Sequence, residues 1–443
     1  MRLDRGTEGD PWRLEIGPRG CVPAAEAVRR VDTAGLNGEK LTATIATEAE
    51  AAWRRIDPAA GRMLQAVWFD AGGQEPGRLL LTIHHLVVDG VSWRILLPDL
   101  AAAWQALADG KQPSPPPGGT SLRRWAEQLV EEARSPRRED EFDLWDRTGA
   151  VEEAVIGKRL LDPATDTAGR ARSLTLSLPA SETEPLLTSV PAAFHGGVND
   201  VLLTALAVAV AHWRRRRGLG DEGPVLVDLE GHGREDVVEG ADLSRTVGWF
   251  TTVHPVRLDP GQLDWDEIWA GGPALGRVLK RIKEQLREVP DNGIGHGLLR
   301  YLNPGTAPLL AARPEPQIGF NYLGRMGTSA GQAGDWAMAP ETAALTGAAA
   351  GDPDVRLAHA LEINAVANDL PGGPELSATW TWPDGLLAER DVNDLAETWF
   401  RALKALAAHA VEPEAGGYTP SDMSLVSLSQ AQLDLLESKW RVS

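Results

Sequence analysis

Two adjacent histidines, His84 and His85, stand at the end of an apolar segment, and Asp89 and Gly90 follow a few residues later. Imidazole is the side chain best suited to moving protons near neutral pH, and an aspartate at this spacing can fix a loop by pairing or by capping. Because neighbouring side chains of a strand point to opposite faces, we expect one histidine to face a cavity and the other the core. The residues alone leave open that both are buried structural histidines.

The residues around the histidines predict a strand, a turn and a helix. Leu79–Val88 has the composition of a strand, Asp89 and Gly90 make a turn, and Ser92 is a candidate N-cap of a helix that begins at Trp93. A proline inside this helix, Pro98, should kink the axis or mark a restart. The histidines are thus expected where a strand gives way to a helix.

A second candidate is Glu230, which ends the apolar segment Val225–Leu229 and is followed by Gly231, His232 and Gly233. Glycines on both sides of a histidine let the backbone turn sharply, which would hold the carboxylate at a strand end facing a cleft. A carboxylate in that position is a candidate general base. The alternative is a solvated turn residue, and spacing alone does not distinguish the two.

Two further segments combine strand patterns with polar groups. The segment at 316–325 reads PQIGFNYLGR, in which Asn321 and Tyr322 supply adjacent hydrogen-bond donors. The segment at 245–258 reads RTVGWFTTVHPVRL, and its aromatic pair, Trp249 and Phe250, is expected to belong to the core more often than to the wall of a substrate site.

Composition and charge exclude several classes of protein. Of the 443 residues, 43% are apolar, which is typical of a core-forming chain rather than a disordered one. The single Cys21 cannot make an internal disulfide, no His/Cys cluster has the spacing of a metal site, and the glycine-rich stretch 292–297 lacks the spacing of a phosphate cradle. The net charge of −19 disfavours nucleic acid as a partner.

No segment predicts a membrane location. The longest apolar run, Val201–Ala211, is far shorter than the ~20 residues of a spanning helix and is interpreted as a buried helix. The N-terminal segment Met1–Trp12 carries charges and no apolar stretch, so it does not have the pattern of a secretory signal. A cytoplasmic location is expected, because a reducing compartment suits a chain without disulfides.

Hydrophobic periodicity predicts strands that alternate with helices. The strands are expected at 79–88, 173–178, 225–229, 247–258, 317–322, 357–366 and 375–382. The helices are expected at 93–108, 122–133, 199–217, 275–288 and 392–411. The fold class is therefore α/β or α+β, with mixed sheets covered by helices. A weakly patterned stretch at 149–172 places a domain boundary near residue 165, which divides the chain into 1–165 and 166–443.

Taken together, the motifs resemble those of the epimerization domains of non-ribosomal peptide synthetases, a branch of the condensation-domain superfamily. The blocks that carry the resemblance are HHLVVDGVSWRIL at 84–96, EGHGRE at 230–235, RTVGWFTTVHPVRL at 245–258, FNYLGR at 320–325 and GYTPSD at 417–422. The His-His-x-x-x-Asp-Gly signature is shared by the whole superfamily. The Ser-Trp-Arg continuation, the Glu-Gly-His-Gly-Arg block and the Arg-Thr-Val-Gly-Trp-Phe block resemble the epimerizing branch.

The resemblance implies a fold and a set of roles. The fold would be two-lobed and similar to chloramphenicol acetyltransferase, with an N-terminal lobe that lacks the first strand and helix of other members. His85 and Glu230 would be the catalytic pair at the lobe interface, and Asn321 and Tyr322 would belong to a block needed for activity. The residues that hold the motif loop would be His84, Asp89, Gly90, Ser92 and Trp93.

The implied activity is epimerization at the Cα of an aminoacyl or peptidyl thioester, from L to a mixture of L and D. Glu230 or His85 would take the proton on one face, and the other residue or a water would return one on the opposite face. Asn321, Tyr322 or a backbone N–H would donate to the developing oxyanion. Burial would raise the pKa of Glu230 toward neutrality, which suits a group that is both base and acid.

The implied partners follow from the same resemblance. The substrate would be presented on the 4'-phosphopantetheine arm of a peptidyl carrier domain, beside other synthetase domains, and the domain itself would be monomeric with no cofactor or metal of its own. Two alternatives remain. An amide-forming condensation domain would require a second carrier-bound substrate, and a non-catalytic module that docks a carrier domain would usually lack the motif histidine.

Overall fold

The computed structural model describes residues 1–6, 12–18, 20–73, 75–151, 153–220, 223–327, 336–345, 352–412, 415–423, 425–426 and 428–440. The chain forms two compact units that are interleaved in sequence. Unit 1 comprises Met1–Trp125, Gly240–Phe250 and Thr328–Pro353, and unit 2 comprises Ala126–Glu239, Thr251–Gly327 and Asp354–Ser443. Because of this interleaving, the boundary near residue 165 stays a prediction.

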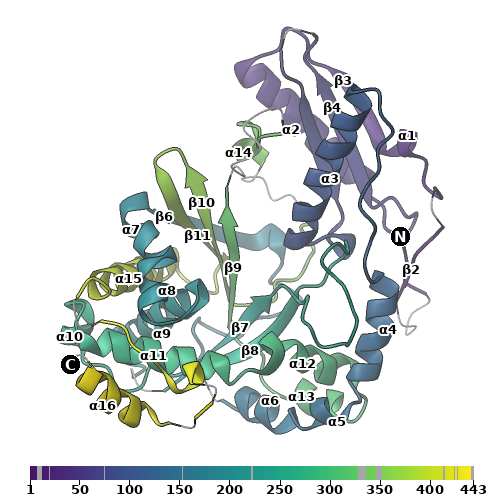
Figure 1. Ribbon diagram of the computed structural model, residues 1–443. Helices are drawn as coiled ribbons and strands as arrows, with labels where there is room; N and C mark the ends of the chain where they lie inside the picture. Colours follow the sequence, from purple (N-terminus) through teal and green to yellow (C-terminus); the bar gives the residue numbers. More distant parts are fainter. Residues whose placement is uncertain are drawn as a thin grey trace. The chain divides into compact units, whose positions relative to one another are not determined.

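Unit 1 contains a three-stranded sheet in the order β3-β4-β5, formed by Val28–Asp32, Leu64–Asp70 and Arg78–Ile83. Helix α2 (Gly38–Arg55) packs on it, with Ile45 and Ala52 against Val67 and Phe69. Figure 1 shows α2 beside β3 and β4. Sequence patterns predicted no element before residue 79, so the prediction missed β3, β4 and α2; this helix is rich in alanine and charged residues and buries only Ile45 and Ala52.

The remaining elements of unit 1 are short, apart from α3. Helix α3 covers Gly90–Ala108 and continues through Pro98, so it begins three residues before the predicted start. Short elements are β1 (Arg2–Asp4), β2 (Arg13–Glu15), α1 (Ala24–Ala27), η1 (His85–Val87) and α14 (Thr342–Leu345). Helix α4 (Leu122–Glu132) spans the change from unit 1 to unit 2.

Unit 2 is built on a six-stranded mixed sheet in the order β6-β11-β10-β9-β7-β8. Its strands are Ala171–Leu178 (β6), Val225–Gly231 (β7), Thr252–Leu258 (β8), Ile318–Met326 (β9), Leu361–Leu370 (β10) and Gly373–Pro383 (β11). Strand β9 runs parallel to β7 and β10, and the other pairs are antiparallel. The predicted class, a mixed sheet covered by helices, is confirmed.

The central strands bury alternate residues, as a sheet with one covered face requires. Strand β10 alternates buried and partly buried residues along most of its length, and β11 does the same. Ile363, Phe320 and Leu229 lie in register across three neighbouring strands and all belong to the main core. The residues between them therefore share the opposite face, which is polar.

Helices pack on the apolar face of this sheet. They are α7 (Ala180–Leu187), α8 (Ser189–Ala193), α9 (Val198–Arg216), α10 (Trp265–Trp269), α11 (Pro273–Arg287) and α15 (Glu389–His409), drawn together in Figure 1. Helix α9 is buried on every side over Val201–Ala211, as its apolar sequence predicted. Among the described residues, no single helix is long and apolar enough to cross a membrane; α7 to α9 pass that test only as a pair bent by 104°.

The other elements of unit 2 lie mostly near β8 and at the C-terminus. They are α5 (Pro136–Glu139), α6 (Phe142–Gly149), η2 (Ala168–Arg170), η3 (Pro290–Gly293), α12 (Ile294–Gly297), η4 (Leu298–Leu302), α13 (Ala307–Ala311), η5 (Pro420–Asp422) and α16 (Gln430–Trp440). A small core joins three of them, with Trp145 packed against Leu299 and Leu310.

Two helices of unit 2 carry runs of basic residues, Arg214–Arg217 at the end of α9 and Arg277, Lys280, Arg281, Lys283 and Arg287 along α11. Arg214 pairs with Glu153, and Lys283, whose side chain is only 1% exposed, pairs with Asp422 in the C-terminal segment. The basic residues of these helices therefore contribute to ion pairs within unit 2.

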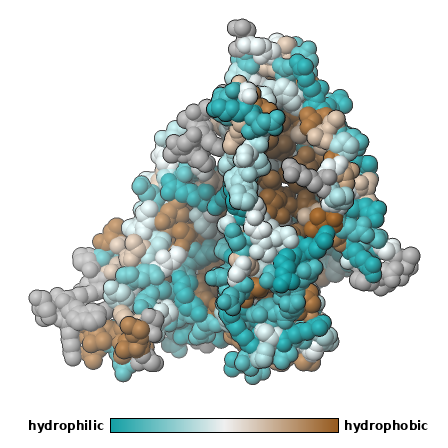
Figure 2. Space-filling model, turned by 45° about the vertical axis from the view of Figure 1, so that its right-hand side comes forward, coloured by the Kyte–Doolittle hydropathy of each residue, from teal (hydrophilic) through white to brown (hydrophobic). Residues whose placement is uncertain are grey.

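On the face drawn in Figure 2, hydrophilic residues cover most of the surface and hydrophobic residues gather in patches among them.

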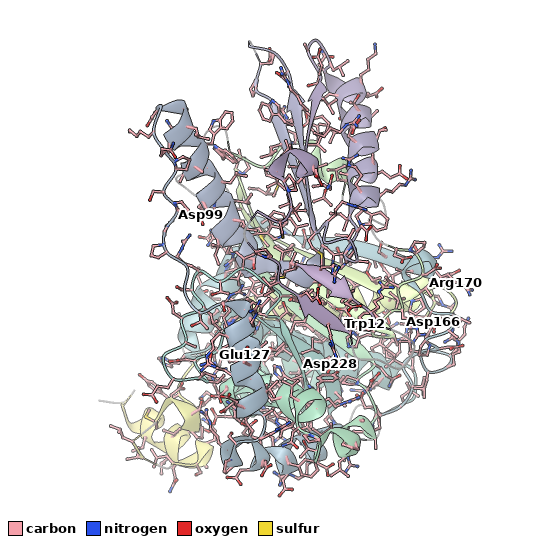
Figure 3. The ribbon with its side chains drawn as sticks, turned by 90° about the vertical axis from the view of Figure 1, so that its right-hand side faces the viewer. Trp12, Asp99, Glu127, Asp166, Arg170 and Asp228 are labelled. Atoms are coloured by element: carbon pink, nitrogen blue, oxygen red, sulfur yellow. The ribbon has the colours of Figure 1, made fainter. Side chains whose placement is uncertain are left out.

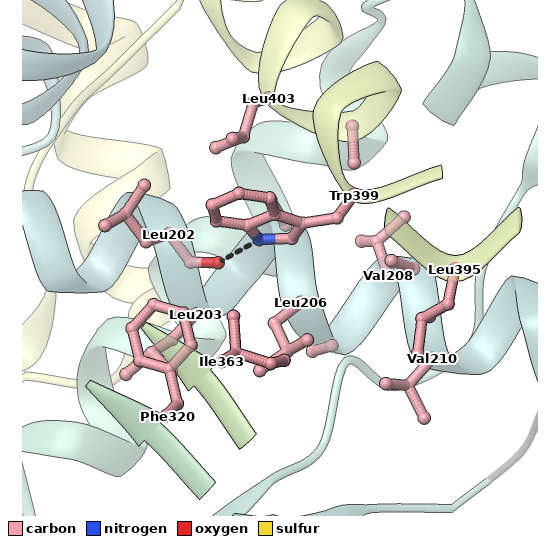
Figure 4. Close-up of a cluster of buried hydrophobic side chains, with 14 of the residues drawn as sticks. Leu202, Leu203, Leu206, Val208, Val210, Phe320, Ile363, Leu395, Trp399 and Leu403 are labelled. Carbon is pink, nitrogen blue, oxygen red and sulfur yellow. Dashed lines mark hydrogen bonds between the residues drawn. The ribbon is translucent and has the colours of Figure 1, made fainter. Parts of the chain in front are cut away.

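Trp399 stands at the centre of the helical layer of unit 2. Its indole is fully buried between α9 and the sheet, and its Nε1–H donates to the carbonyl oxygen of Leu202 at 3.0 Å (Figure 4). We expect Trp399→Ala to lower the free energy of unfolding by about 3–5 kcal/mol, and Trp399→Phe to lower it by less. Trp104→Ala, at a residue that is 57% exposed, should cost under about 1 kcal/mol. Chemical denaturation measures all three, and equal effects at the two tryptophans would contradict this assignment.

Candidate functional site

The His84-His85 pair lies in a turn of 3-10 helix in unit 1, not in a strand. Strand β5 ends at Ile83, and the Nδ1 atom of His84 accepts the N–H of Leu86 at 3.1 Å, which caps the turn. The strand predicted for 79–88 is therefore wrong after Ile83. The N–H of Leu86 donates to the side chain of His84 instead of to a neighbouring strand, so the backbone turns here. Burial, together with the nearby His85, lowers the pKa of His84, so it is expected to be neutral.

His85 differs from His84 in both exposure and contacts. Its side chain is exposed within the turn, and its ring lies 4.5 Å from the ring of Trp249, centroid to centroid. Trp249 is itself 48% exposed, whereas the next residue, Phe250, is buried. The aromatic pair of this block is therefore divided: Phe250 is a core residue, and Trp249 forms a surface wall beside the histidine.

Asp89 joins the histidine motif to the segment that carries Trp249. It is the N-cap of α3, where its Oδ1 accepts the N–H of Ser92 at 2.7 Å, and its Oδ2 accepts the N–H of Phe250 at 3.1 Å. The prediction that Ser92 caps this helix is wrong, because the carboxylate three residues earlier takes that role. Capping is one of the two ways in which an aspartate at this spacing was expected to fix the loop.

Ser92 and Trp93 lie in the first turn of α3. The Ser92 hydroxyl donates to the carbonyl oxygen of Gly248 at 2.9 Å and accepts the N–H of the same residue at 3.1 Å. The N–H of Trp93 donates to the backbone carbonyl of Asp89. Further along α3, Asp99, labelled in Figure 3, accepts two hydrogen bonds from Arg245. The histidine block and the 245–250 block are thus bonded at several points within unit 1.

Gly90 is the first residue of α3, and its conformation does not require glycine. Its φ angle is ordinary, and a Cβ built on it would meet no atom within 4 Å. Glycine is also used where a ligand approaches the backbone closely. The open space beside Gly90 is compatible with that use.

Glu230 lies on β7 in unit 2, one residue before the strand ends at Gly231. Burial and, to a smaller extent, the nearby carboxylate of Glu362 raise its pKa to about 7, and the cation of His359 opposes this increase. The sequence-based prediction that burial brings this carboxyl group close to neutrality agrees with that value. Near pH 7 such a group can both accept and return a proton.

Three residues that the sequence analysis did not single out share the environment of Glu230. His359 lies between two carboxylates: its Nδ1 is 2.6 Å from Glu362 Oε2, and its Nε2 is 3.0 Å from Asp228 Oδ2. These two partners raise the pKa of His359 to about 9 although burial opposes the shift, so it is a cation at neutral pH. The alternating spacing of Asp228 and Glu230 on one strand was the signal that could have identified this face.

Asn321 and Tyr322 lie on β9 beside β7, and they point to opposite faces of the sheet. Phe320, in register with Leu229, is a core residue, so alternation turns Asn321 to the polar face and Tyr322 back toward the core. Tyr322 packs against the main hydrophobic cluster, and burial raises its pKa. Only Asn321 therefore shares a face with Glu230.

The loop after Glu230 is tied to the glycine-rich stretch 292–297. Gly233 has φ +67°, which allows the sharp turn that the sequence predicted, and Asn292 donates to the Glu235 carboxylate at 2.7 Å. In the stretch itself, a Cβ on Gly293 would lie 2.1 Å from the ring of His254, and one on Gly295 would lie 1.9 Å from a Glu141 oxygen. These glycines permit close packing. In the part of the chain that the structure describes, no group of His, Cys, Asp or Glu is arranged to hold a metal ion.

Comparisons with known proteins place these features in a family. The condensation-domain family model matches residues 26–342, a range that contains the histidine block, Glu230 and Asn321. One of the linear gramicidin synthase proteins of Brevibacillus parabrevis is 40% identical over 392 residues, which are 88% of this chain and 5% of that protein. Chondramide synthase of Chondromyces crocatus is 35% identical over 442 residues, 98% of this chain and 10% of that protein. The chain thus spans a small fraction of these relatives.

Solved structures agree with the family match. The epimerization domain from the third module of tyrocidine synthetase B has a TM-score of 0.72 and 29% sequence identity, covering 86% of this chain and 80% of that one. A condensation domain of the enacyloxin polyketide synthase shares the fold, with a TM-score of 0.63 and 19% identity, covering 94% of this chain and 73% of that one. The chain belongs to the condensation-domain family, and the resemblance to epimerization domains inferred from its motifs is confirmed.

Asp89 provides a first test of the site in unit 1. We expect Asp89→Ala to lower the free energy of unfolding by about 2–4 kcal/mol, because it removes the N-cap of α3 and the buried carboxylate that accepts the N–H groups of Ser92 and Phe250. Asp89→Asn keeps one acceptor oxygen and should cost less. Asp32→Ala is the control, since Asp32 is exposed and accepts one N–H. Denaturant titration measures the changes, and an Asp89→Ala effect as small as the control would contradict the bridging role.

Glu230 provides a test through the pH dependence of stability. A carboxyl group whose pKa is raised by folding stabilises the folded chain below its ordinary pKa of 4.5, and this contribution is lost as the pH rises through about 7. We therefore expect Glu230→Gln to be more stable than the parent chain above pH 7 by about 1–3 kcal/mol, with the difference shrinking toward pH 4.5. Unfolding measured at several pH values checks this, and a difference independent of pH would refute the raised pKa.

Proposed function

We propose that this chain is an epimerization domain that interconverts the L and D forms of an aminoacyl or peptidyl thioester carried on the phosphopantetheine arm of a carrier domain. The observation that carries the proposal is the partly buried Glu230, whose pKa of about 7 suits a residue that both removes and returns a proton. The likeness to a solved epimerization domain supports the same choice within the family.

In the proposed reaction, the Cα–H bond breaks and its proton passes to Glu230 or His85. The electron pair is delocalised onto the thioester oxygen, giving an enolate. A proton then returns to Cα on the opposite face, from the other of the two residues or from water. The net change is inversion at one carbon, with no redox change and no leaving group.

The enolate oxygen needs a hydrogen-bond donor, because proton transfer alone typically contributes only about 10²–10⁴-fold. Asn321 is the side chain we assign to this task, since it shares the polar face of the sheet with Glu230. The phenol of Tyr322 packs against the core instead, so its place in the sheet does not support a direct role on that face. Backbone N–H groups remain a second source of donors.

His85 is the second proposed proton-transfer residue, and it lies in the other unit of the chain. Its exposed position beside Trp249 leaves the imidazole accessible to a substrate. The carrier domain and neighbouring synthetase domains are therefore the proposed partners, as the multidomain length of the relatives suggests.

The direct test is exchange of the Cα proton. An L-aminoacyl or L-peptidyl group is loaded on a carrier domain, the chain is added in deuterated water, and Cα deuterium and chirality are followed by mass spectrometry and chiral chromatography. We expect deuterium uptake with formation of an L/D mixture, at least 100-fold slower in Glu230→Gln and in His85→Asn. The matched controls are Glu239→Gln and His195→Asn, which change an exposed glutamate and an exposed histidine and should retain full rates.

The outcomes separate the candidate activities. A Glu230→Gln variant of normal activity would remove this residue from the mechanism. If no exchange occurs, but an amide forms when a second carrier-bound amine is supplied, the chain is a condensation domain. If neither reaction occurs while the carrier domain still binds, the chain is a docking module.

A further inference from the structure

The polar face of the sheet in unit 2 carries a cluster of charged groups that the proposed proton transfer does not use directly. Asp228, labelled in Figure 3, precedes Glu230 by two residues on β7 and therefore shares its face. Glu362 on β10 is in register with Gly319 on β9, which is in turn in register with Asp228. Strands β7 and β10, on either side of β9, thus bring Asp228, Glu230 and Glu362 to one face.

His359 spans this cluster from the segment that leads into β10. Each of its ring nitrogens is within hydrogen-bonding distance of a carboxylate, Nδ1 of Glu362 and Nε2 of Asp228, and its side chain is only 11% exposed. Both ring nitrogens act as donors only in the imidazolium form. The two contacts therefore stabilise the imidazolium form of His359, and they hold its ring in one orientation.

The sheet leaves room for this arrangement at one position. A Cβ on Gly319 would lie 2.5 Å from the Glu362 oxygen and 2.5 Å from His359 Nδ1, so a larger residue would displace the pair. The φ angle of Gly319 is ordinary, so its backbone conformation does not demand glycine. The glycine just before Phe320 is thus explained by the space that the histidine and its partner occupy.

We propose that His359 is a positioning residue for Glu230. Held between Asp228 and Glu362, the His359 cation neutralises the negative charge of these two carboxylates. Glu230 is then the one carboxyl group of this cluster that exchanges protons with the substrate. This inference rests on the proposed function. His359 touches no reacting atom in this scheme, and it acts through the charge that it places beside Glu230.

The direction of the effect follows from the charges around Glu230. Glu362 favours protonation of Glu230, whereas the His359 cation opposes it. Beyond these two, Asp228 lies on the same strand as Glu230. His296 of α12 is partly buried, which lowers its pKa, and the charge of Asp228 opposes this shift. Removing the His359 cation leaves two carboxylates near Glu230 uncompensated. Glu230 then holds its proton to higher pH and is a usable base over a narrower range.

The experiment measures the pH profile of Cα exchange in four proteins: the parent chain, His359→Gln, Glu362→Gln and the double variant. In His359→Gln the acidic limb of the profile, where the exchange rate falls as Glu230 becomes protonated, should move to higher pH by about one unit. In Glu362→Gln it should move to lower pH, because a repelling charge is lost. In the double variant the two changes oppose each other, so the limb should return toward its position in the parent chain.

A purely structural role for His359 predicts a different pattern. Loss of packing alone would lower the rate at all pH values without moving the limb, and removing Glu362 as well would only add to the damage. An unmoved limb in His359→Gln therefore overturns the proposal. If that variant does not fold, Glu362→Gln decides alone, and a limb that stays in place or moves to higher pH overturns the proposal.

A second readout does not depend on activity. Carbon-13 NMR of glutamate side-chain carboxyl groups, with Glu230→Gln to assign the signal, follows the titration of Glu230 directly in each variant. If the titration moves as expected and no substrate shows exchange, the electrostatic role stands and the proposed function fails. If exchange occurs but neither the titration nor the limb moves in the variants, the function stands and the role of His359 fails.

Discussion

The central constraint in this protein is the alternation of side chains along the six-stranded sheet of unit 2. Alternate residues of β7, β9 and β10, among them Leu229, Phe320 and Ile363, belong to the same apolar core as residues of α9, α11 and α15. The intervening residues must then share the other face, whatever their charge. Asp228, Glu230 and Glu362 are brought together because their neighbours in sequence belong to the core.

Placing three carboxyl groups on a partly buried face costs free energy, and this cost explains both the presence of His359 and the raised pKa of Glu230. Ionised carboxyl groups lose hydration and repel one another, so the face requires either a cation or a proton. His359 is the cation for two of the three carboxylates, and it lies within hydrogen-bonding distance of Glu362 and Asp228. The missing side chain of Gly319 leaves the space that His359 and Glu362 occupy. Glu230 instead has a pKa near neutrality. The property that suits it to proton transfer is thus the same property that lowers stability at neutral and higher pH.

A different principle organises unit 1. There a single buried carboxylate, Asp89, accepts hydrogen bonds from two segments that are far apart in sequence. It caps α3 and at the same time holds the segment that carries Trp249 against the helix start. Ser92 strengthens the same connection through Gly248. The motif blocks recognised in the sequence therefore belong together physically, since each supplies a partner for the buried polar groups of the other.

The sequence by itself determined the family, the mixed α/β class and the strands and helices with strong periodicity, because these depend on local patterns and on side chains that are specific to a motif. It also singled out Glu230 and the role of Asp89 in fixing the loop. Tertiary structure alone decided which neighbours each group has. The strand ends at Ile83, where His84 caps a turn. Asp89 caps α3 with one oxygen and binds the distant Phe250 N–H with the other. His359 becomes a cation because β7 and β10 each supply a carboxylate. Such partners come from distant segments, and hydrophobic periodicity carries no information about them.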